Sequence, residues 1–332
     1  MSYLFVSEQG ASIGIRGGRI EIKCKDEMLR SIPFETLETI QIFGHVNVTT
    51  QCLTACLEKG IILNYYSTTG RYYGRLVSPC HVNVERQRMQ ALIGEDREFC
   101  LAVSKSIVRA KVQNQKVILR RYARRQDTKV SEAIQDMSNM QKHIVDCENI
   151  PQLMGYEGAA ARTYFKALGR LINPEFAFDK RSRRPPRDEF NSMISLGYSI
   201  LLNEIVGKLE GRGLNPYFGI MHSDREKHPT LASDLMEEWR AVIVDSTTMS
   251  LVNGHEIKKN EFDRDENGVY LSNTAFKTFV RKLDNKLRTD SRYIETEEFS
   301  TDFRHSLDHQ ITSLVKAMEE KKADIYQPVV II

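Results

Sequence analysis

Hydrophobic and polar residues alternate with period two along most of the first eighty positions, which is typical of β-strands with one buried face. Two such runs flank Gly17-Gly18, a pair that tolerates the positive φ of a tight hairpin turn. One short helix is predicted from Thr50 to Lys59, with Thr49 or Thr50 as a hydroxyl N-cap and Gly60 as its stop. Strands are predicted at residues 11–15, 19–24, 30–33, 39–43, 61–66 and 72–77.

After about Val82 the pattern changes to the period of amphipathic helices. Residues 188–209 are apolar nearly all round, which predicts a helix in the middle of a bundle. The chain is therefore predicted to have an α+β fold, with a small β-rich domain at residues 1–82 and a larger all-α domain at 83–332. Helices are predicted at roughly 85–122, 131–147, 151–171, 188–209, 231–252, 273–288 and 301–321.

Composition is that of an ordinary soluble globular chain of 332 residues, with 41% hydrophobic and 27% charged residues. No run approaches the ~18 apolar residues that cross a bilayer, and the N-terminus has no signal-peptide pattern. The six cysteines contain no CxxC pair, so we expect a cytoplasmic protein with reduced thiols and no membrane contact.

Positive charge is concentrated in two segments, although the net charge is only +3. Residues 104–129 hold nine basic residues and one acid, and part of this set recurs at steps of four and seven, on one helix face. Residues 180–187 are denser in charge and, with two prolines, are predicted to form a loop. A one-sided basic stripe suits phosphate contacts that position DNA without reading its sequence, whereas the alternative is a solvated helix flank. The candidate DNA-binding residues are Lys105, Arg109, Lys116, Arg120, Arg124, Arg183, Arg184 and Arg187.

Three residues far apart in the sequence form a candidate metal site: Glu157, His222 and Glu237. Two carboxylates and an imidazole are suitable ligands for Mg²⁺ or Mn²⁺. Helical spacing places Asp234 beside either Glu237 or Glu238, and spacing alone does not choose between them. The alternative is an exposed acidic helix face. The pair His305 and His309 also has metal-ligand spacing, but its polar surroundings are typical of an exposed helix face.

Four sequence blocks resemble the CRISPR-associated protein one family, the integrase-endonuclease of CRISPR adaptation. They occur in the family's order: Tyr156-Glu157-Gly158…Ala161-Arg162…Tyr164-Phe165; Arg184-Pro185-Pro186-Arg187-Asp188…Asn191…Gly197-Tyr198; Gly213-Leu214-Asn215-Pro216-Tyr217…Gly219…His222; and Leu231…Asp234-Leu235-Met236-Glu237-Glu238. The resemblance places the metal ligands on Glu157, His222 and Glu237, with Asp234 as a supporting catalytic residue. Arg162, in the first block, joins the candidate DNA-binding residues.

This resemblance implies a metal-dependent DNA endonuclease and integrase that inserts short duplexes into the CRISPR array by 3′-hydroxyl transesterification. It further implies Mg²⁺ or Mn²⁺ as cofactor, double-stranded and branched DNA as substrate, and a homodimer that forms through the β-rich domains. A small ferredoxin-like second CRISPR-associated protein is the implied partner, and a further CRISPR-associated nuclease is an additional candidate. The alternative function is a non-catalytic scaffold that binds nucleic acid through residues 104–129 and 180–187.

Overall fold

The computed structural model describes residues 2–25, 27–123, 127–182, 185–266, 268–294 and 299–331. Three of the candidate DNA-binding residues, Arg124, Arg183 and Arg184, lie outside these described residues. The chain forms two compact units, Met1–Val82 and Asn83–Ile332. Each unit has its own hydrophobic core and is described separately below.

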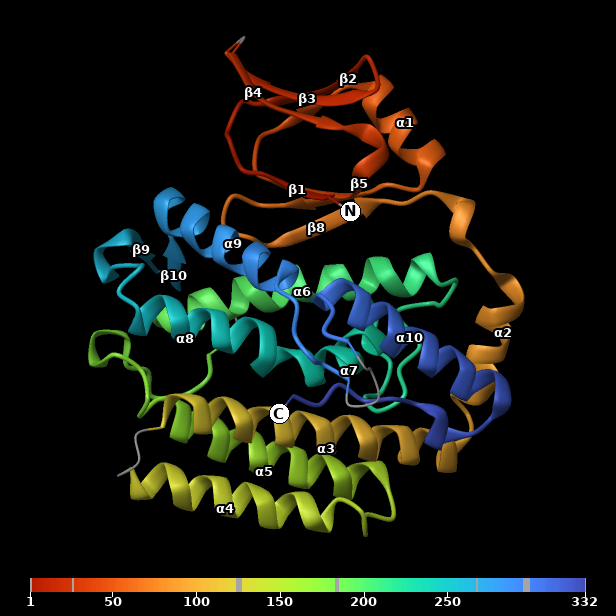
Figure 1. Cartoon of the computed structure of the whole chain (residues 1–332), viewed down its shortest axis with the longest axis vertical. Helices are drawn as coiled ribbons and strands as arrows, with labels where there is room; N and C mark the ends of the chain where they lie inside the picture. Colours follow the sequence, from red (N-terminus) through yellow and green to blue (C-terminus); the bar gives the residue numbers. More distant parts are fainter. Residues whose placement is uncertain are drawn as a thin grey trace. The chain divides into compact units, whose positions relative to one another are not determined.

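Two four-stranded sheets form the first unit, with the unit's hydrophobic core between them (Figure 1). The core combines residues of both sheets: Ile13 and Ile20 from one and Ile40 and Leu63 from the other, all fully buried. One sheet has the order β1 (Ser2–Val6), β5 (Leu37–Phe43), β7 (Ile62–Tyr66) and β8 (Tyr72–Leu76). The other has the order β4 (Glu27–Pro33), β3 (Arg19–Cys24), β2 (Ser12–Arg16) and β6 (Asn47–Val48). Strands β1 and β6 were not among the predicted strands.

Local signals in the first unit act as the sequence predicts. Gly17 and Gly18, with φ of 55° and 70°, connect the antiparallel strands β2 and β3. Helix α1 (Thr50–Lys59) begins at Thr49, whose hydroxyl accepts a hydrogen bond from the Cys52 amide at 3.3 Å. It ends at Gly60, which has a left-handed φ of 70°. These caps satisfy backbone groups that a helix end otherwise leaves without partners.

The second unit is mostly helical, which confirms the α+β prediction. Helix α6 lies at its centre and packs against α7, α8 and α10, as its apolar surface predicts. The unit is not all-α, however, because the hairpin β9 (Phe262–Asp265) and β10 (Gly268–Leu271) packs on α6. No helix in the described ranges is long and apolar enough to span a membrane. The helices are α2 (Val84–Ile93), α3 (Arg97–Tyr122), α4 (Thr128–His143), α5 (Ile150–Leu168), α6 (Glu189–Gly211), α7 (Thr230–Trp239), α8 (Ser246–Asn253), α9 (Asn273–Arg288) and α10 (Phe303–Glu320).

Two of the predicted helices are interrupted in the structure. The helix predicted at 85–122 is divided into α2 and α3, because Asp96 caps a new start by accepting hydrogen bonds from the Glu98 and Phe99 amides. The helix predicted at 231–252 contains the π-helical segment η4 (Arg240–Asp245) between α7 and α8. Because a π-helical turn changes the register of the residues that follow it, Arg240 and Asp245 both face Tyr198 of α6.

Candidate metal centre

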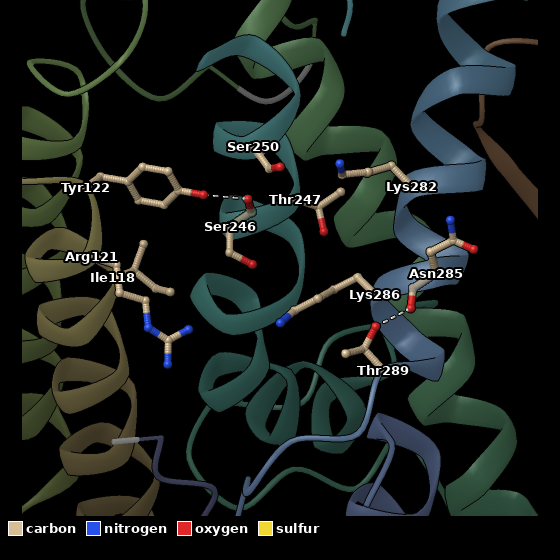
Figure 2. A pocket seen from close by; sticks show the side chains of 10 residues that line it. All are labelled: Ile118, Arg121, Tyr122, Ser246, Thr247, Ser250, Lys282, Asn285, Lys286 and Thr289. Carbon is tan, nitrogen blue, oxygen red and sulfur yellow. Dashed lines mark hydrogen bonds between the residues drawn. The ribbon is translucent and has the colours of Figure 1, made fainter. Parts of the chain in front are cut away.

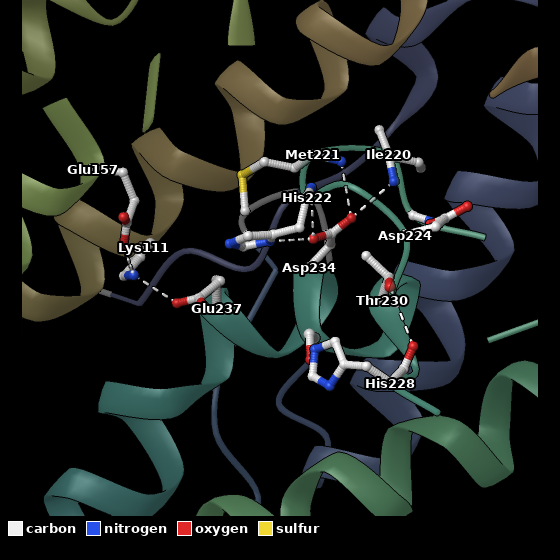
Figure 3. A network of polar contacts seen from close by, with 12 residues as sticks. Lys111, Glu157, Ile220, Met221, His222, Asp224, His228, Thr230, Asp234 and Glu237 are labelled. Atoms are coloured by element: carbon white, nitrogen blue, oxygen red, sulfur yellow. Dashed lines mark hydrogen bonds and ion pairs between the residues drawn. The ribbon is translucent and has the colours of Figure 1, made fainter. Parts of the chain in front are cut away.

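The side chains of Glu157 and Glu237 converge on the ammonium group of Lys111 (Figure 3). Glu157 comes from α5, Glu237 from α7 and Lys111 from α3. The Lys111 Nζ forms an ion pair with Glu157 and lies 2.6 Å from Glu237 Oε2. The exposed fractions of these side chains are 15% for Glu157, 6% for Glu237 and 7% for Lys111. Two carboxylates from distant parts of the chain therefore share one positive charge in a largely buried place.

His222 presents its imidazole beside these glutamates from the loop that precedes α7. Its Nδ1 lies 2.6 Å from Asp234 Oδ1. Because an ionised carboxylate only accepts hydrogen bonds, we assign Nδ1 as the donor, which leaves the lone pair of the neutral ring on Nε2. The hydrogen bond to Asp234 raises the pKa of His222 against the opposing effect of burial, and the charges of Glu237 and Glu157 add to the rise. His222 is thus within electrostatic range of both glutamates.

Asp234 fixes the loop that carries His222. It is fully buried, and its Oδ2 accepts hydrogen bonds from the Ile220 and Met221 amides at 2.8 and 2.9 Å. Its Oδ1 also accepts from the His222 amide at 3.3 Å. The loop also requires glycine at position 219, because a Cβ there would lie only 2.4 Å from a side-chain carbon of Thr230. The sequence placed Asp234 in a supporting role, and its hydrogen bonds give that role a structural basis.

The two adjacent glutamates of α7 have different environments. Burial alone would raise the pKa of Glu237, but the Arg240 guanidinium and the Lys111 ammonium outweigh it and lower that pKa to about 2. Glu237 is therefore ionised at neutral pH. Glu238 points away from Lys111 and is fully buried, and burial raises its pKa to about 8. It accepts hydrogen bonds from Tyr326 Oη, Gln310 Nε2 and the Val329 amide at 2.6–2.8 Å, so it holds the C-terminal segment.

The donor groups at this place suit a divalent cation, although the ligand assignment stays a prediction. Within the described ranges, no group of three His, Cys, Asp or Glu side chains is arranged as a metal site. The Lys111 ammonium instead pairs with both glutamates. Glu237 Oε2 is buried and accepts no hydrogen bond of ordinary geometry from the residues described, although Lys111 Nζ is near. Such an oxygen, a second carboxylate and the free Nε2 of His222 are groups that Mg²⁺ and Mn²⁺ accept.

A buried polar network contacts the Glu237 carboxylate through Arg240, and the sequence did not predict this network. Arg240 Nη2 lies 3.1 Å from Glu237 Oε1, and the Arg240 guanidinium lies 5.0 Å from the centre of the Tyr198 ring. The Tyr198 hydroxyl donates to Asp245 at 2.6 Å, and Tyr164 donates to the other oxygen of Asp245 at 2.9 Å. One signal in the sequence indicates part of this network: Arg240 follows Glu237 by three positions, a spacing that places the two side chains on one helix face.

The predicted basic stripe on α3 is not a continuous exposed surface. Lys116 is buried, and its ammonium bonds to Ser138 Oγ and Gln141 Oε1 of α4. Lys105 likewise donates to the Val145 carbonyl at 2.8 Å. The regular spacing therefore places these two lysines against the protein, and Lys116 is a wrong candidate for an exposed phosphate contact. The other described candidates, Arg109, Arg120, Arg162 and Arg187, are exposed, as are His305 and His309.

The two-unit fold, with a β-sandwich followed by a helical unit that holds this site, is a fold found among solved CAS1 structures. A CAS1 protein from Thermotoga maritima aligns with a TM-score of 0.81 and 23% identity over 96% of this chain and 97% of that chain, which shows the shared fold. A chain of a Cas6-RT-Cas1–Cas2 complex aligns with a TM-score of 0.85 and 25% identity, covering 98% of this chain and 36% of that chain. This chain thus spans about a third of the length of that larger protein.

Sequence comparison identifies the family. The family model of CRISPR associated protein Cas1 matches residues 4–285. The CRISPR-associated endonuclease Cas1 of Mycobacterium tuberculosis (strain CDC 1551 / Oshkosh) is 36% identical over 321 residues, which cover 96% of this chain and 94% of that protein. The chain belongs to the Cas1 family, which confirms the resemblance drawn from the four sequence blocks.

Proposed function

We propose that this protein is a metal-dependent DNA endonuclease and integrase of CRISPR adaptation, which inserts short duplexes into the array by 3′-hydroxyl transesterification. The observation that carries the proposal is the convergence of Glu157 and Glu237 on one buried positive charge beside His222. Membership of a family whose M. tuberculosis relative is named an endonuclease supports it.

Glu157, Glu237 and the Nε2 of His222 would hold Mg²⁺ or Mn²⁺. When bound, such an ion offsets the negative charge that develops on phosphoryl oxygens during phosphodiester transfer. Asp234 keeps the His222 ring in the orientation and tautomer that expose Nε2. Lys111 and Arg240 keep Glu237 ionised, so that its carboxylate is ready to act as a ligand.

The assembly follows from the same family membership and remains part of the proposal. We propose a homodimer that associates with a small ferredoxin-like second CRISPR-associated protein and with double-stranded or branched DNA. The larger protein that shares this fold was solved in a complex with Cas2, which supports that choice of partner.

The test compares variants at the site with an exposed control. Glu157→Gln and His222→Ala should each lower strand joining of a 3′-hydroxyl duplex into plasmid DNA by at least about 10²-fold with Mn²⁺ present, since ligand removal abolishes charge stabilisation. Glu148→Gln, an exposed residue just before α5, should keep the wild-type rate. Circular dichroism and thermal unfolding confirm that each variant is folded. If Glu157→Gln or His222→Ala joins strands at the wild-type rate, the site assignment is wrong.

The alternative, a non-catalytic nucleic-acid scaffold, is weaker than the sequence suggested. It depended on two basic surfaces, but Lys116 is buried against α4. In the second segment Arg181 packs on the Tyr198 ring and donates to Asn191 Oδ1 at 2.9 Å. A scaffold would bind DNA equally well in EDTA and Mn²⁺ and leave it intact, whereas the proposed enzyme cleaves branched DNA only with the metal.

A further inference from the structure

The ammonium group of Lys111 lies between the carboxylates of the two glutamates that are predicted metal ligands (Figure 3). It pairs with Glu157 and lies 2.6 Å from Glu237 Oε2. The Lys111 side chain is only 7% exposed, and within the described ranges these two glutamates are its ion-pair partners. A buried ammonium needs such partners, because an unpaired charge in the interior is strongly disfavoured. Lys111 therefore depends on the same two carboxylates as the predicted metal ion.

Both oxygens of the Glu237 carboxylate face a cationic side chain. Oε2 lies beside the Lys111 ammonium, and Oε1 lies 3.1 Å from Arg240 Nη2. A divalent ion bound to Glu237 would therefore lie close to at least one of these positive charges. Since like charges at such short range repel one another strongly, binding of the ion favours displacement of one of the two side chains.

Arg240 is the more firmly held of these two cations. It follows Glu237 by three positions, and its guanidinium packs over the Tyr198 ring at 5.0 Å from the ring centre. Lys111 instead reaches the site from α3 on a flexible four-carbon stem. Its other partner, Glu157, is also a predicted ligand, so a metal ion would take both groups that hold the ammonium. Displacement of Lys111 leaves the pair between Arg240 and Glu237 in place.

We propose that Lys111 is an internal competitor of the metal ion: its ammonium neutralises Glu157 and Glu237 until Mg²⁺ or Mn²⁺ binds these carboxylates and displaces it. This proposal rests on the metal assignment of the proposed function. A displaced ammonium has lost both carboxylate partners, so it moves toward solvent, where water satisfies its charge. Competition for the carboxylates lowers the affinity of the site for the metal, while the same ion pairs hold the two carboxylates together in the metal-free protein.

The first experiment measures the displacement on the full-length wild-type protein at one fixed pH. Lysine amines are acetylated with an N-hydroxysuccinimide ester in EDTA or in saturating Mn²⁺, and each lysine is quantified by peptide mass spectrometry. The Lys111 amine should react slowly in EDTA, because it is buried and paired. In Mn²⁺ it should react at least about 10-fold faster, because release from two charge-assisted contacts frees the amine.

Two other lysines of the same protein are internal references. Lys116, five positions further along α3, is buried and bonds to Ser138 Oγ and Gln141 Oε1, so it should react slowly in both conditions. It would gain reactivity only if Mn²⁺ loosened α3 in general. Lys286 is half-buried and lines a cavity of about 540 Å³ whose lining includes none of the predicted ligands (Figure 2). Its rate should be the same with and without the metal.

The second experiment measures Mn²⁺ affinity from the electron paramagnetic resonance signal of free Mn²⁺. Lys111→Met removes the competing charge and keeps most of the side-chain volume, so it should bind Mn²⁺ at least about 10-fold more tightly than the wild type. Lys116→Met removes a buried charge from the same helix and should bind Mn²⁺ like the wild type. His222→Ala removes a predicted ligand but keeps Lys111 and both glutamates. In that variant Lys111 should become reactive only at Mn²⁺ concentrations at least about 10-fold higher.

The outcomes separate this proposal from the proposed function. A Lys111 amine that becomes reactive in Mn²⁺, together with tighter binding by Lys111→Met, supports the competition. If Lys111 stays unreactive in saturating Mn²⁺ while His222→Ala weakens Mn²⁺ binding, the metal site is correct and the competition is wrong. If neither the wild type nor Lys111→Met binds Mn²⁺, both the metal assignment and the competition are wrong. Acetylation of the wild type needs no variant, so it decides the question even if Lys111→Met does not fold.

Discussion

Replacing Asp234 by asparagine tests how the loop presents His222. The Asp234 carboxylate accepts from the Ile220 and Met221 amides on one oxygen and from the amide and ring of His222 on the other. An asparagine has one accepting oxygen and one donating NH₂ group, so it can satisfy only one of these two sides.

Each orientation of the amide has a different cost. If the NH₂ group faces Ile220 and Met221, two buried backbone N–H groups lose their partner, at about 1–3 kcal/mol each. If it faces His222, the ring must accept on Nδ1 and carry its proton on Nε2, so the lone pair needed for a metal is lost. The second orientation keeps the two shorter bonds from Ile220 and Met221 and removes only the 3.3 Å bond from the His222 amide, so it is the expected one. Asp234→Asn should then lose about 1–3 kcal/mol of stability and bind Mn²⁺ about 10- to 100-fold more weakly.

Urea unfolding measures the stability, and the electron paramagnetic resonance signal of free Mn²⁺ measures the metal affinity. Asp224→Asn is the control, because Asp224 is exposed and its carboxylate accepts a single backbone bond in the same loop, from the Gly219 amide at 2.8 Å. It should change both quantities much less. The reasoning is refuted if Asp234→Asn binds Mn²⁺ like the wild type and unfolds at the same urea concentration.

Two further predictions concern the buried charges near the centre. Lys111→Met leaves the ionised Glu237 beside Glu157 without their shared counter-ion, so the free energy of unfolding of the metal-free protein should fall by about 3 kcal/mol. Mn²⁺ should then raise the Tm of this variant more than that of the wild type. Equal stability of the two metal-free proteins would contradict this prediction. Burial raises the pKa of Asp245 to about 6, so this carboxyl binds a proton more tightly in the folded protein than in the unfolded chain. The stability gained from that proton is fully present below about pH 3.8 and is lost as the pH rises through about 6. The stability of the wild type relative to Asp245→Asn should therefore fall by about 1.4 kcal/mol per pH unit between pH 4.5 and 5.5 and level off above about 6.5 in urea titrations, whereas a constant difference would show that Asp245 does not titrate in this range.

The sequence by itself determined the β-rich first unit, the mostly helical second unit and the three blocks that carry the predicted ligands, although it did not reveal β1, β6 or the hairpin β9–β10. Local signals were sufficient for this, because caps such as Thr49 and Gly60 act within a few residues. The apolar surface of α6 likewise required burial wherever the helix lay.

Tertiary structure alone decided which side chains face one another. Spacing along α7 did not distinguish Glu237 from Glu238, but packing turned the first toward Lys111 and the second toward the C-terminal segment. It also turned Lys116 into the protein and brought Arg121 and Lys286 to one cavity. Periodicity fixes which residues share a face of one helix, but the element that covers that face comes from a distant part of the chain, and only the packed core determines it.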